Sequence, residues 1–213
     1  MDKWSDLYTI NATVPVSVPD GESGDWKVYS YEVGEQDAKW DMVRAMVSTS
    51  YQGRHVPQGH YKALKRGTET IMSNTPDEIR DCYSFFRNAK GRVLVNGLGL
   101  GVVLEVILAK VDPGTGKPAV DEAVVVENSD DVIKLVGPTF SSNPRVRIVK
   151  GNALSFPAKK LGMFDAVWHD IWDNICSDNL EDMHKLHVKY GHRTKWQGSW
   201  CRERCELQRR RWR

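Results

Sequence analysis

Residues 93–101 read Val-Leu-Val-Asn-Gly-Leu-Gly-Leu-Gly, and a helical pattern follows directly over 100–110. A short apolar run before closely spaced glycines is typical of a buried strand that turns sharply into a helix. Glycine permits the tight turn, lets the backbone approach a ligand and leaves amide groups free near the helix N-terminus. The stretch therefore predicts a strand, a nucleotide-binding loop and a helix in succession.

The spacing of Gly97, Gly99 and Gly101 bears on which nucleotide would bind. A dinucleotide fingerprint has the form G-x-G-x-x-G. Its last glycine would fall at Val102 when counted from Gly97, and at Leu104 when counted from Gly99. The G-x-G-x-G spacing disfavours NAD. It leaves open the alternative that the glycines serve only close packing of the strand against the helix.

Strand and helix patterns alternate around this loop. Apolar runs predict strands at 93–96, 124–127, 146–149 and 164–169, with helices over 100–110 and 130–136. This alternation implies right-handed crossovers and a parallel sheet that binds its ligand at the carboxyl ends of the strands. A further helix should bury one face made of Leu180, Met183, Leu186 and Tyr190. We expect no strand after residue 191.

The N-terminal part predicts a hairpin and two helices. Residues 13–18 and 26–33 read as the two strands of the hairpin. A helix expected over 36–50 should bury a face made of Trp40, Val43, Met46 and Val47. A helix expected over 76–89 begins with a capping box, in which Thr75 caps the helix, Pro76 follows and Glu78 reaches back.

Length and composition fit one sizeable α/β domain with an extension. The chain has 213 residues, of which 40% are hydrophobic and 27% charged, as in ordinary globular proteins. We divide it into an N-terminal extension (1–74), a Rossmann-like domain (75–192) and a basic Trp- and Arg-rich segment (193–213). The net charge of +2 combines about +6 in that segment with about −4 elsewhere. The basic segment is either a solvated end or a contact for a polyanion such as nucleic acid.

The first residues, Met1-Asp2-Lys3-Trp4, do not have the pattern of a secretory leader. Four cysteines without a secretory leader favour a reducing compartment, and we expect a cytoplasmic protein. No apolar run approaches the roughly 20 residues needed to span a bilayer, so we expect no membrane partner.

Polar residues follow three of the predicted strands. Glu127 ends an all-valine strand, where its two carboxylate oxygens could accept hydrogen bonds from both hydroxyls of a ribose. Asn152, followed by Ala153, stands after the third strand, and its carbonyl oxygen could accept from the amino group of an adenine. These positions meet at one edge of a parallel sheet.

The densest set of reactive side chains follows the fourth strand, in Trp168-His169-Asp170-Ile171-Trp172-Asp173-Asn174. We expect Trp168 to be a core residue. His169 or Asp170 could take a proton from a nucleophile, and Asp173 could orient a cation. Trp172 could stack on a planar or cationic substrate.

Taken together, the glycine loop, Glu127 and the residues after the later strands resemble the class I S-adenosylmethionine-dependent methyltransferases over roughly residues 75–190. The resemblance is strongest to a branch that shares features with spermidine synthases: Arg145-Val146 leads to Gly151-Asn152-Ala153, and Asp170 and Asp173 lie three apart. The Asn-Gly-Leu-Gly-Leu-Gly and Trp-His-Asp-Ile-Trp-Asp runs look like those of uncharacterised methyltransferase-like proteins of phages and bacteria. The resemblance implies S-adenosylmethionine as cofactor, held by Asn96, Gly97, Leu98, Gly99, Gly101, Glu127, Asn128, Asn152, Ala153 and Asp170.

Two departures from that family stand out. Asn96 and Asn152 occupy positions where the family commonly has acidic residues, which removes negative charge near a sulfonium. The family's sheet also continues through further strands, including an antiparallel final hairpin. We therefore expect a sheet abbreviated at its C-terminal side or completed by the N-terminal hairpin.

A zinc site is the alternative reading of the C-terminal histidines and cysteines. His184, His187, Cys201 and Cys205 have loose ligand spacings. On a helix they would equally be surface or core residues, and we predict no metal site.

Three functions fit these observations. The first is methyl transfer from S-adenosylmethionine to an unidentified small molecule or nucleic acid, with His169, Asp170 or Asp173 in catalytic roles. The second is aminopropyl transfer to a polyamine, in which Asp170 and Asp173 anchor ammonium groups. The third is cofactor or nucleic-acid binding without turnover. A homo-oligomer is also compatible with the sequence.

Overall fold

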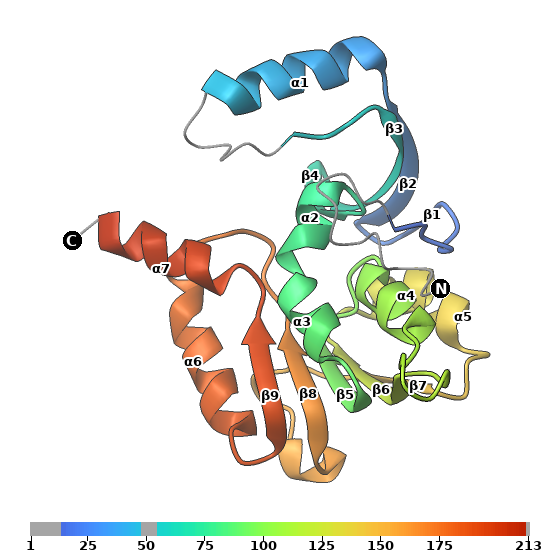
Figure 1. Cartoon of the computed structure of the whole chain (residues 1–213), viewed down its shortest axis with the longest axis vertical. Helices are drawn as coiled ribbons and strands as arrows, with labels where there is room; N and C mark the ends of the chain where they lie inside the picture. Colours follow the sequence, from blue (N-terminus) through green and yellow to red (C-terminus); the bar gives the residue numbers. More distant parts are fainter. Residues whose placement is uncertain (1–13, 48–54, 212–213) are drawn as a thin grey trace.

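The computed structural model describes residues 14–47 and 55–211 and contains two sheets (Figure 1). The larger sheet has five parallel strands, β5 (Gly91–Asn96), β6 (Val120–Glu127), β7 (Val146–Lys150), β8 (Phe164–His169) and β9 (Thr194–Ser199), in the order β7-β6-β5-β8-β9. The order of the parallel strands is therefore 3-2-1-4-5. It reverses between β5 and β8, where folds of this kind open a ligand-binding crevice at the carboxyl ends of the strands. The predicted α/β class is confirmed.

Helices cover both faces of this sheet. The helices that pack on its strands are α3 (Tyr83–Asn88), α4 (Val102–Ala109), α5 (Asp130–Phe140) and α6 (Asn179–Tyr190). Helix α2 (Pro76–Asp81) packs against α3, α7 (Arg202–Arg211) packs against α6, and a 3₁₀ turn spans Ala158–Leu161. Side chains alternate along each strand, so Val93 and Val95 of β5 pack with α3 and α4, whereas Leu94 packs with α6. The predicted apolar face of α6 is buried. No helix in the described ranges is long and apolar enough to cross a membrane.

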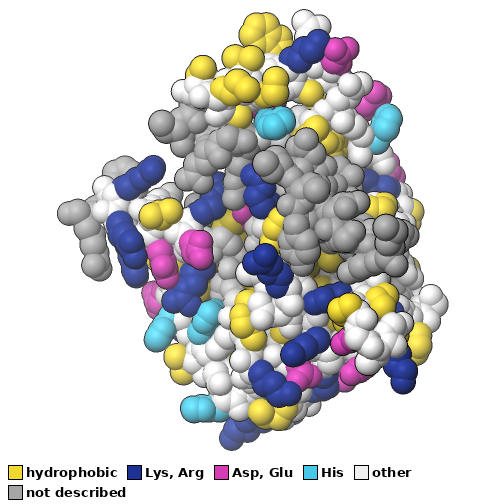
Figure 2. Space-filling model, viewed as in Figure 1, with side chains coloured by type: hydrophobic (Ala, Val, Ile, Leu, Met, Phe, Trp, Pro, Cys, Tyr) yellow, Lys and Arg dark blue, Asp and Glu magenta, His cyan; other side chains and the backbone are white. Residues whose placement is uncertain are grey.

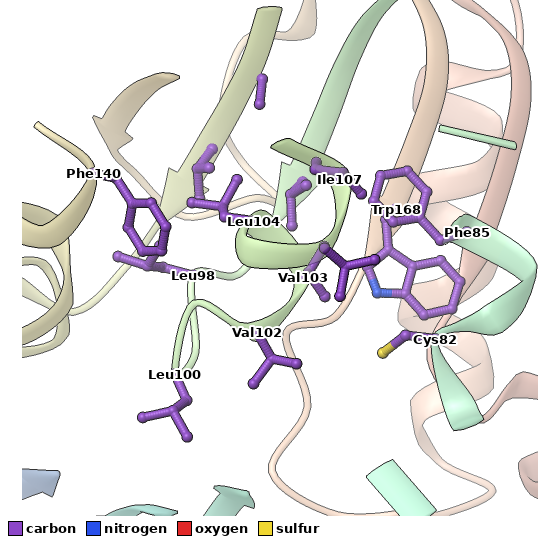
Figure 3. Packing of buried hydrophobic residues seen from close by; sticks show 14 of the residues in the cluster. Cys82, Phe85, Leu98, Leu100, Val102, Val103, Leu104, Ile107, Phe140 and Trp168 are labelled. Carbon is purple, nitrogen blue, oxygen red and sulfur yellow. The ribbon is translucent and has the colours of Figure 1, made fainter. Parts of the chain in front are cut away.

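The core on the α3 and α4 side fixes the glycine loop in place (Figure 3). Leu104 and Ile107 of α4 are almost completely buried, as is Leu100 of the loop. Near them Phe85 of α3 stacks on Trp168 of β8, with ring centroids 5.6 Å apart. Each fully buried large side chain of this kind contributes about 1.5–3 kcal/mol through the hydrophobic effect. The loop therefore rests on a rigid base.

The strand β9 corrects the expectation that no strand follows residue 191. It pairs in parallel with β8, from Phe164 opposite Thr194 to His169 opposite Ser199. Its Thr-Lys-Trp-Gln-Gly-Ser sequence has no apolar run because it is an edge strand and only partly buried. Its main anchor is Trp196, which stacks on Trp168 with ring centroids 6.5 Å apart.

The smaller sheet is antiparallel and belongs to the N-terminal part. Its strands are β1 (Gly21–Ser23), β2 (Trp26–Val33), β3 (Gly59–Arg66) and β4 (Glu69–Ser73), in that order, with α1 (Glu35–Val47) between β2 and β3. It forms a separate sheet and does not complete the parallel one. The hairpin pairs β1 with β2, so the strand predicted at 13–18 is wrong over 14–18, and Thr13 lies outside the described residues.

Two helix predictions from the N-terminal part also need correction. Trp40, Val43, Met46 and Val47 of α1 are exposed rather than buried. Residues 48–50, which end the predicted helix, lie outside the described residues. The helix expected over 76–89 is two short helices that meet at Cys82. The Thr75 side chain makes no capping hydrogen bond to the helix.

Candidate active site

A cavity of about 310 Å³ opens where β5, β6 and β8 end. The glycine loop and the segments that follow β6, β7 and β8 line one side of it. Trp26 of β2, Leu64 of β3 and Met72 of β4 line the other. The antiparallel sheet therefore forms a wall that sequence reasoning did not assign to the site, because only the tertiary fold brings it there.

The three loop glycines are required for different reasons. All have positive φ angles, of 100° at Gly97, 51° at Gly99 and 80° at Gly101, which side chains rarely adopt. A Cβ atom on Gly97 would overlap the backbone carbonyl of Asp170, and one on Gly99 would lie 2.7 Å from the sulfur of Met72. Gly97, Leu98 and Gly99, which we predict to hold the cofactor, line the cavity.

The third glycine, Gly101, serves close packing of helices rather than the lining of the cavity. It does not line the cavity, and a Cβ atom there would lie 2.7 Å from the ring of Phe140 on α5. The prediction that Gly101 contacts the cofactor is therefore not supported by its position. Its role is to let α4 begin close against α5.

Glu127 joins the glycine loop to the end of β6. Its side chain is buried, and the N–H of Leu98 donates to Oε2 at 2.7 Å. The N–H of Ser129 donates to Oε1, also at 2.7 Å. Each carboxylate oxygen retains a second lone pair, so the group can still accept from two hydroxyls of a ligand. Glu127 lines the cavity together with Asn128, and both are residues that we predict to hold the cofactor.

The segment after β7 lines the cavity through Gly151, Asn152 and Ala153. The N–H of Leu154 donates to Asn152 Oδ1 at 2.9 Å, which uses one lone pair of the oxygen expected to bind adenine. A second lone pair and the two N–H groups of the amide are available to a purine edge. The local turn thus fixes the position of Asn152 and leaves most of the hydrogen-bonding groups of its amide available to a ligand.

His169 and Asn96 lie away from the cavity, contrary to prediction. Both are fully buried and neither lines it. Asn96 Nδ2 donates to His169 Nδ1 at 2.8 Å, which leaves the proton on Nε2, 3.3 Å from Gln197 Oε1. Burial lowers the pKa of His169 to about 3, so the ring stays neutral. The predicted roles of His169 as base and Asn96 as cofactor ligand do not fit this geometry.

Asp170 lines the cavity, and so does a second acidic residue that sequence reasoning missed. This residue is Glu78 of α2. Ser73 holds Glu78 through its N–H, which donates to Oε2 at 2.6 Å, and its hydroxyl, which donates to Oε1 at 3.0 Å. The bonds to Ser73 are the physical reason that Glu78 does not complete the predicted capping box.

Burial raises the pKa of both carboxyl groups to about 7. The negative charge of Asp170 adds to the effect on Glu78, and Asp81 raises both values further. A carboxyl with a pKa near neutrality is suited to proton transfer, because both protonation states are populated at working pH. The only sequence signal for a role of Glu78 in the site is its position ahead of β5. The capping-box pattern explains a glutamate at this position equally well without such a role.

The remaining predicted residues, Trp172 and Asp173, also line the cavity. Asp173 is already paired, because Arg66 of β3 donates to its Oδ2 at 2.6 Å. The Arg66 guanidinium lies over the ring of Trp26, 5.3 Å from its centroid. Arg66 therefore links the antiparallel wall to the segment after β8 across the mouth of the site.

The charge of the cavity is one-sided. Five carboxylate side chains line it: Glu78, Glu127, Asp170, Asp173 and Asp182. None of the residues lining it in the described part of the chain is a lysine or an arginine. The cavity therefore favours a ligand that carries positive charge.

The C-terminal histidines and cysteines do not converge. His187 contacts Ser199 and Arg202, while the thiol of Cys201 donates to Asp81 Oδ2 at 3.2 Å. Across residues 14–47 and 55–211, no group of three or more His, Cys, Asp or Glu side chains is placed to hold a metal ion.

Comparison with known proteins gives likenesses of fold only. No family model matches the sequence, and a search of curated proteins found no match. Solved structures that resemble the chain include a protein-L-isoaspartate O-methyltransferase, with 16% identity and a TM-score of 0.41 over 62% of this chain and 37% of that one. Spermidine synthase from Thermotoga maritima matches with 17% identity and a TM-score of 0.40 over 81% of this chain and 55% of that one. The putative methyltransferase yhhF from Escherichia coli has 14% identity and a TM-score of 0.42, over 71% and 75%.

Several of the matched structures are thus methyltransferases or spermidine synthases, and one of the others, the N-terminal domain of EvdMO1, has SAH bound. The chain spans well under half the length of the protein-L-isoaspartate O-methyltransferase. All of these TM-scores are below 0.5.

Proposed function

We propose that the protein is an S-adenosylmethionine-dependent methyltransferase. The observation that carries the proposal is Glu127, a buried carboxylate at the end of β6 that is bonded to the glycine loop, and this loop follows β5, next to the reversal of the strand order. This is where a nucleoside with two ribose hydroxyls would be held in a sheet of this order. NAD remains disfavoured as the ligand, because the loop lacks the glycine spacing of dinucleotide-binding proteins.

The residues present fit S-adenosylmethionine. The cavity of about 310 Å³ lies within the range of small-molecule sites, roughly 300–1,000 Å³. Glu127 would accept from the ribose, and the amide of Asn152, beside Ala153, would bind the edge of the adenine. Asn96 and Asn152 lack the charge of acidic residues, and Glu78 and Asp170 offer carboxyl groups to the cavity from other segments.

When bound, S-adenosylmethionine supplies a methyl group activated by its sulfonium. The protein's part in the transfer is to align donor and acceptor and to accept any proton that the acceptor must lose. Asp170 is the base we assign, because it lines the cavity and burial raises its pKa to about 7. Glu78 would offer a second carboxyl group to the same cavity, and Trp172 would stack on the acceptor.

A second function, aminopropyl transfer to a polyamine, is favoured by the same acidic lining. Ammonium groups would bind the carboxylates of Glu78 and Asp170, and one amine would lose a proton before attack. Asp173 is a weaker anchor than predicted, since Arg66 already occupies it. Nucleic acid is a less favoured acceptor, because its phosphates would be repelled by the carboxylates around the cavity.

The experiment that tests these functions supplies each donor with its acceptor. The protein is incubated with S-adenosylmethionine and a panel of amines, and separately with decarboxylated S-adenosylmethionine and putrescine. Release of S-adenosylhomocysteine supports methyl transfer, whereas methylthioadenosine and a longer polyamine support aminopropyl transfer. Binding of either donor without any product supports a protein that binds the cofactor without turnover.

Asp170→Asn separates chemistry from binding. We expect it to slow transfer by about 10²–10⁴-fold, the usual contribution of a positioned base, while the affinity for S-adenosylhomocysteine changes little. Asp178→Asn is the matched control, because Asp178 is exposed and lies outside the cavity. Equal activity of the two variants would exclude Asp170 as the base.

A further inference from the structure

The outer face of α1 is the largest collection of exposed apolar side chains on one element. Five of the nine large hydrophobic side chains that are exposed in the described ranges belong to it: Trp40, Met42, Val43, Met46 and Val47. Figure 2 shows hydrophobic side chains gathered at the top of the molecule, over the place of α1 in Figure 1. A contiguous apolar surface of this kind is typical of an interaction site.

The opposite face holds α1 on its own chain. Ala45 is 5% exposed, and Asp41 Oδ2 accepts a hydrogen bond of 2.7 Å from the N–H of Val56. On an α-helix these two residues lie away from Trp40, Val43 and Val47. The orientation of α1 therefore leaves its apolar face directed outward.

The sequence of α1 has the spacing of a helix that pairs with another helix. Gln36, Trp40, Val43 and Val47 follow intervals of four, three and four residues, which place them in one seam of a heptad pattern. Asp37 and Arg44, seven residues apart, flank this seam on the same side. Both are exposed.

We propose that α1 pairs with α1 of a second copy of this chain in antiparallel orientation. Trp40 then packs against Val43 of the second copy, and Asp37 lies beside Arg44 of the second copy. Twofold symmetry makes each of these contacts twice. A parallel pair would instead place Lys39 beside Arg44 of the second copy, which is a contact between like charges.

The charge of α1 argues against a lipid surface as the occupant. The helix carries Glu35, Asp37 and Asp41 against Lys39 and Arg44. Amphipathic helices that bind membranes are rich in basic residues on the polar face, because the lipid surface is anionic. A second copy satisfies both the apolar seam and the two charges that flank it.

The test is the mass of the full chain in solution, measured by sedimentation and light scattering. A pair of 13-residue helices is a small interface, so we expect a dimer that dissociates in the micromolar range and is populated at roughly 100 µM. Trp40→Glu should make the chain monomeric at that concentration. Val188→Glu, at a residue 65% exposed on α6, is the matched control and should leave the dimer intact.

A charge exchange tests the orientation. Arg44→Asp and Asp37→Arg should each weaken the dimer about tenfold, because each places like charges together. Mixing the two variants should restore a heterodimer, since both ion pairs then form again. A wild-type chain that is monomeric at roughly 100 µM, a dimer that Trp40→Glu leaves unchanged, or a mixture that fails to pair would each overturn the proposal.

Discussion

Replacement of Gly97 by alanine tests whether the glycine loop is fixed by the end of β8. A Cβ atom at this position would lie 2.9 Å from the carbonyl carbon of Asp170 and closer still to its oxygen, whereas real Cβ contacts essentially never fall below 3.0 Å. The overlapping group is backbone, which cannot turn aside as a flexible side chain can. The loop or the end of β8 must therefore move.

The expected magnitude has two parts. The φ of 100° costs an L-residue about 1–2 kcal/mol. The displacement of a packed backbone segment adds about 1–3 kcal/mol, the usual cost of overpacking in a core. Gly97→Ala should thus lower the free energy of unfolding by about 2–5 kcal/mol.

Gly67→Ala provides the matched control. Gly67 also has a positive φ, of 57°, but nothing lies within 4 Å of a Cβ atom built there. Only the backbone strain applies, so the loss should be about 1–2 kcal/mol. Urea unfolding of both variants measures the difference. Equal losses would refute the conclusion that the carbonyl of Asp170 requires glycine at position 97.

Three further predictions concern the walls of the site and the sheet. The folded-state pKa of about 7 for Glu78 and Asp170 lies above their ordinary values of 4.5 and 3.8, so the folded state binds more protons between about pH 4 and 7. The free energy of unfolding should therefore fall as the pH rises through this window, by up to about 1.4 kcal/mol per pH unit for each carboxyl. Urea unfolding at several pH values measures this slope, which should be smaller for the double variant E78Q/D170N than for the wild type. Arg66→Ala removes the ion pair with the partly exposed Asp173. Because solvent screens exposed ion pairs, the free energy of unfolding should change by less than about 1 kcal/mol. A larger loss in urea unfolding would mean that this link between the two sheets supports the fold. Trp196→Ala should cost about 2–4 kcal/mol by the same measurement, and a loss below about 1 kcal/mol would contradict the role of its ring stack in holding β9.

Local patterns are sufficient for the parts of the fold that are buried on both faces. The runs that form β5, β6 and β8 are apolar because helices cover these parallel strands on both sides, whereas the edge strand β7 is only partly buried. The carboxyl ends of these strands meet at one edge, which is why the sequence alone predicts that Glu127, Asn152 and Asp170 share one site.

The incorrect predictions for α1, Glu78 and His169 have a common physical cause. A local sequence pattern does not show which distant residues a side chain will contact. The spacing in α1 correctly predicts an apolar face, but the sequence does not state what covers it. Glu78 matches a capping pattern, yet Ser73 offers it two donors. His169 is the last residue of β8 and is fully buried, whereas Asp170 follows the strand and lines the cavity.

Calorimetric titration tests most directly the proposal that the cavity binds S-adenosylmethionine through Glu127. S-adenosylmethionine or S-adenosylhomocysteine is titrated into the wild type, into Glu127→Ala and into Asp121→Ala, which alters an exposed residue near the opposite end of the same strand. We predict one site per chain for the wild type and for Asp121→Ala. For a Glu127→Ala protein shown to be folded by circular dichroism, we predict a loss of at least tenfold in affinity, as expected when charge-assisted hydrogen bonds are removed. Absence of binding to the wild type, or equal affinity of all three proteins, would contradict the account.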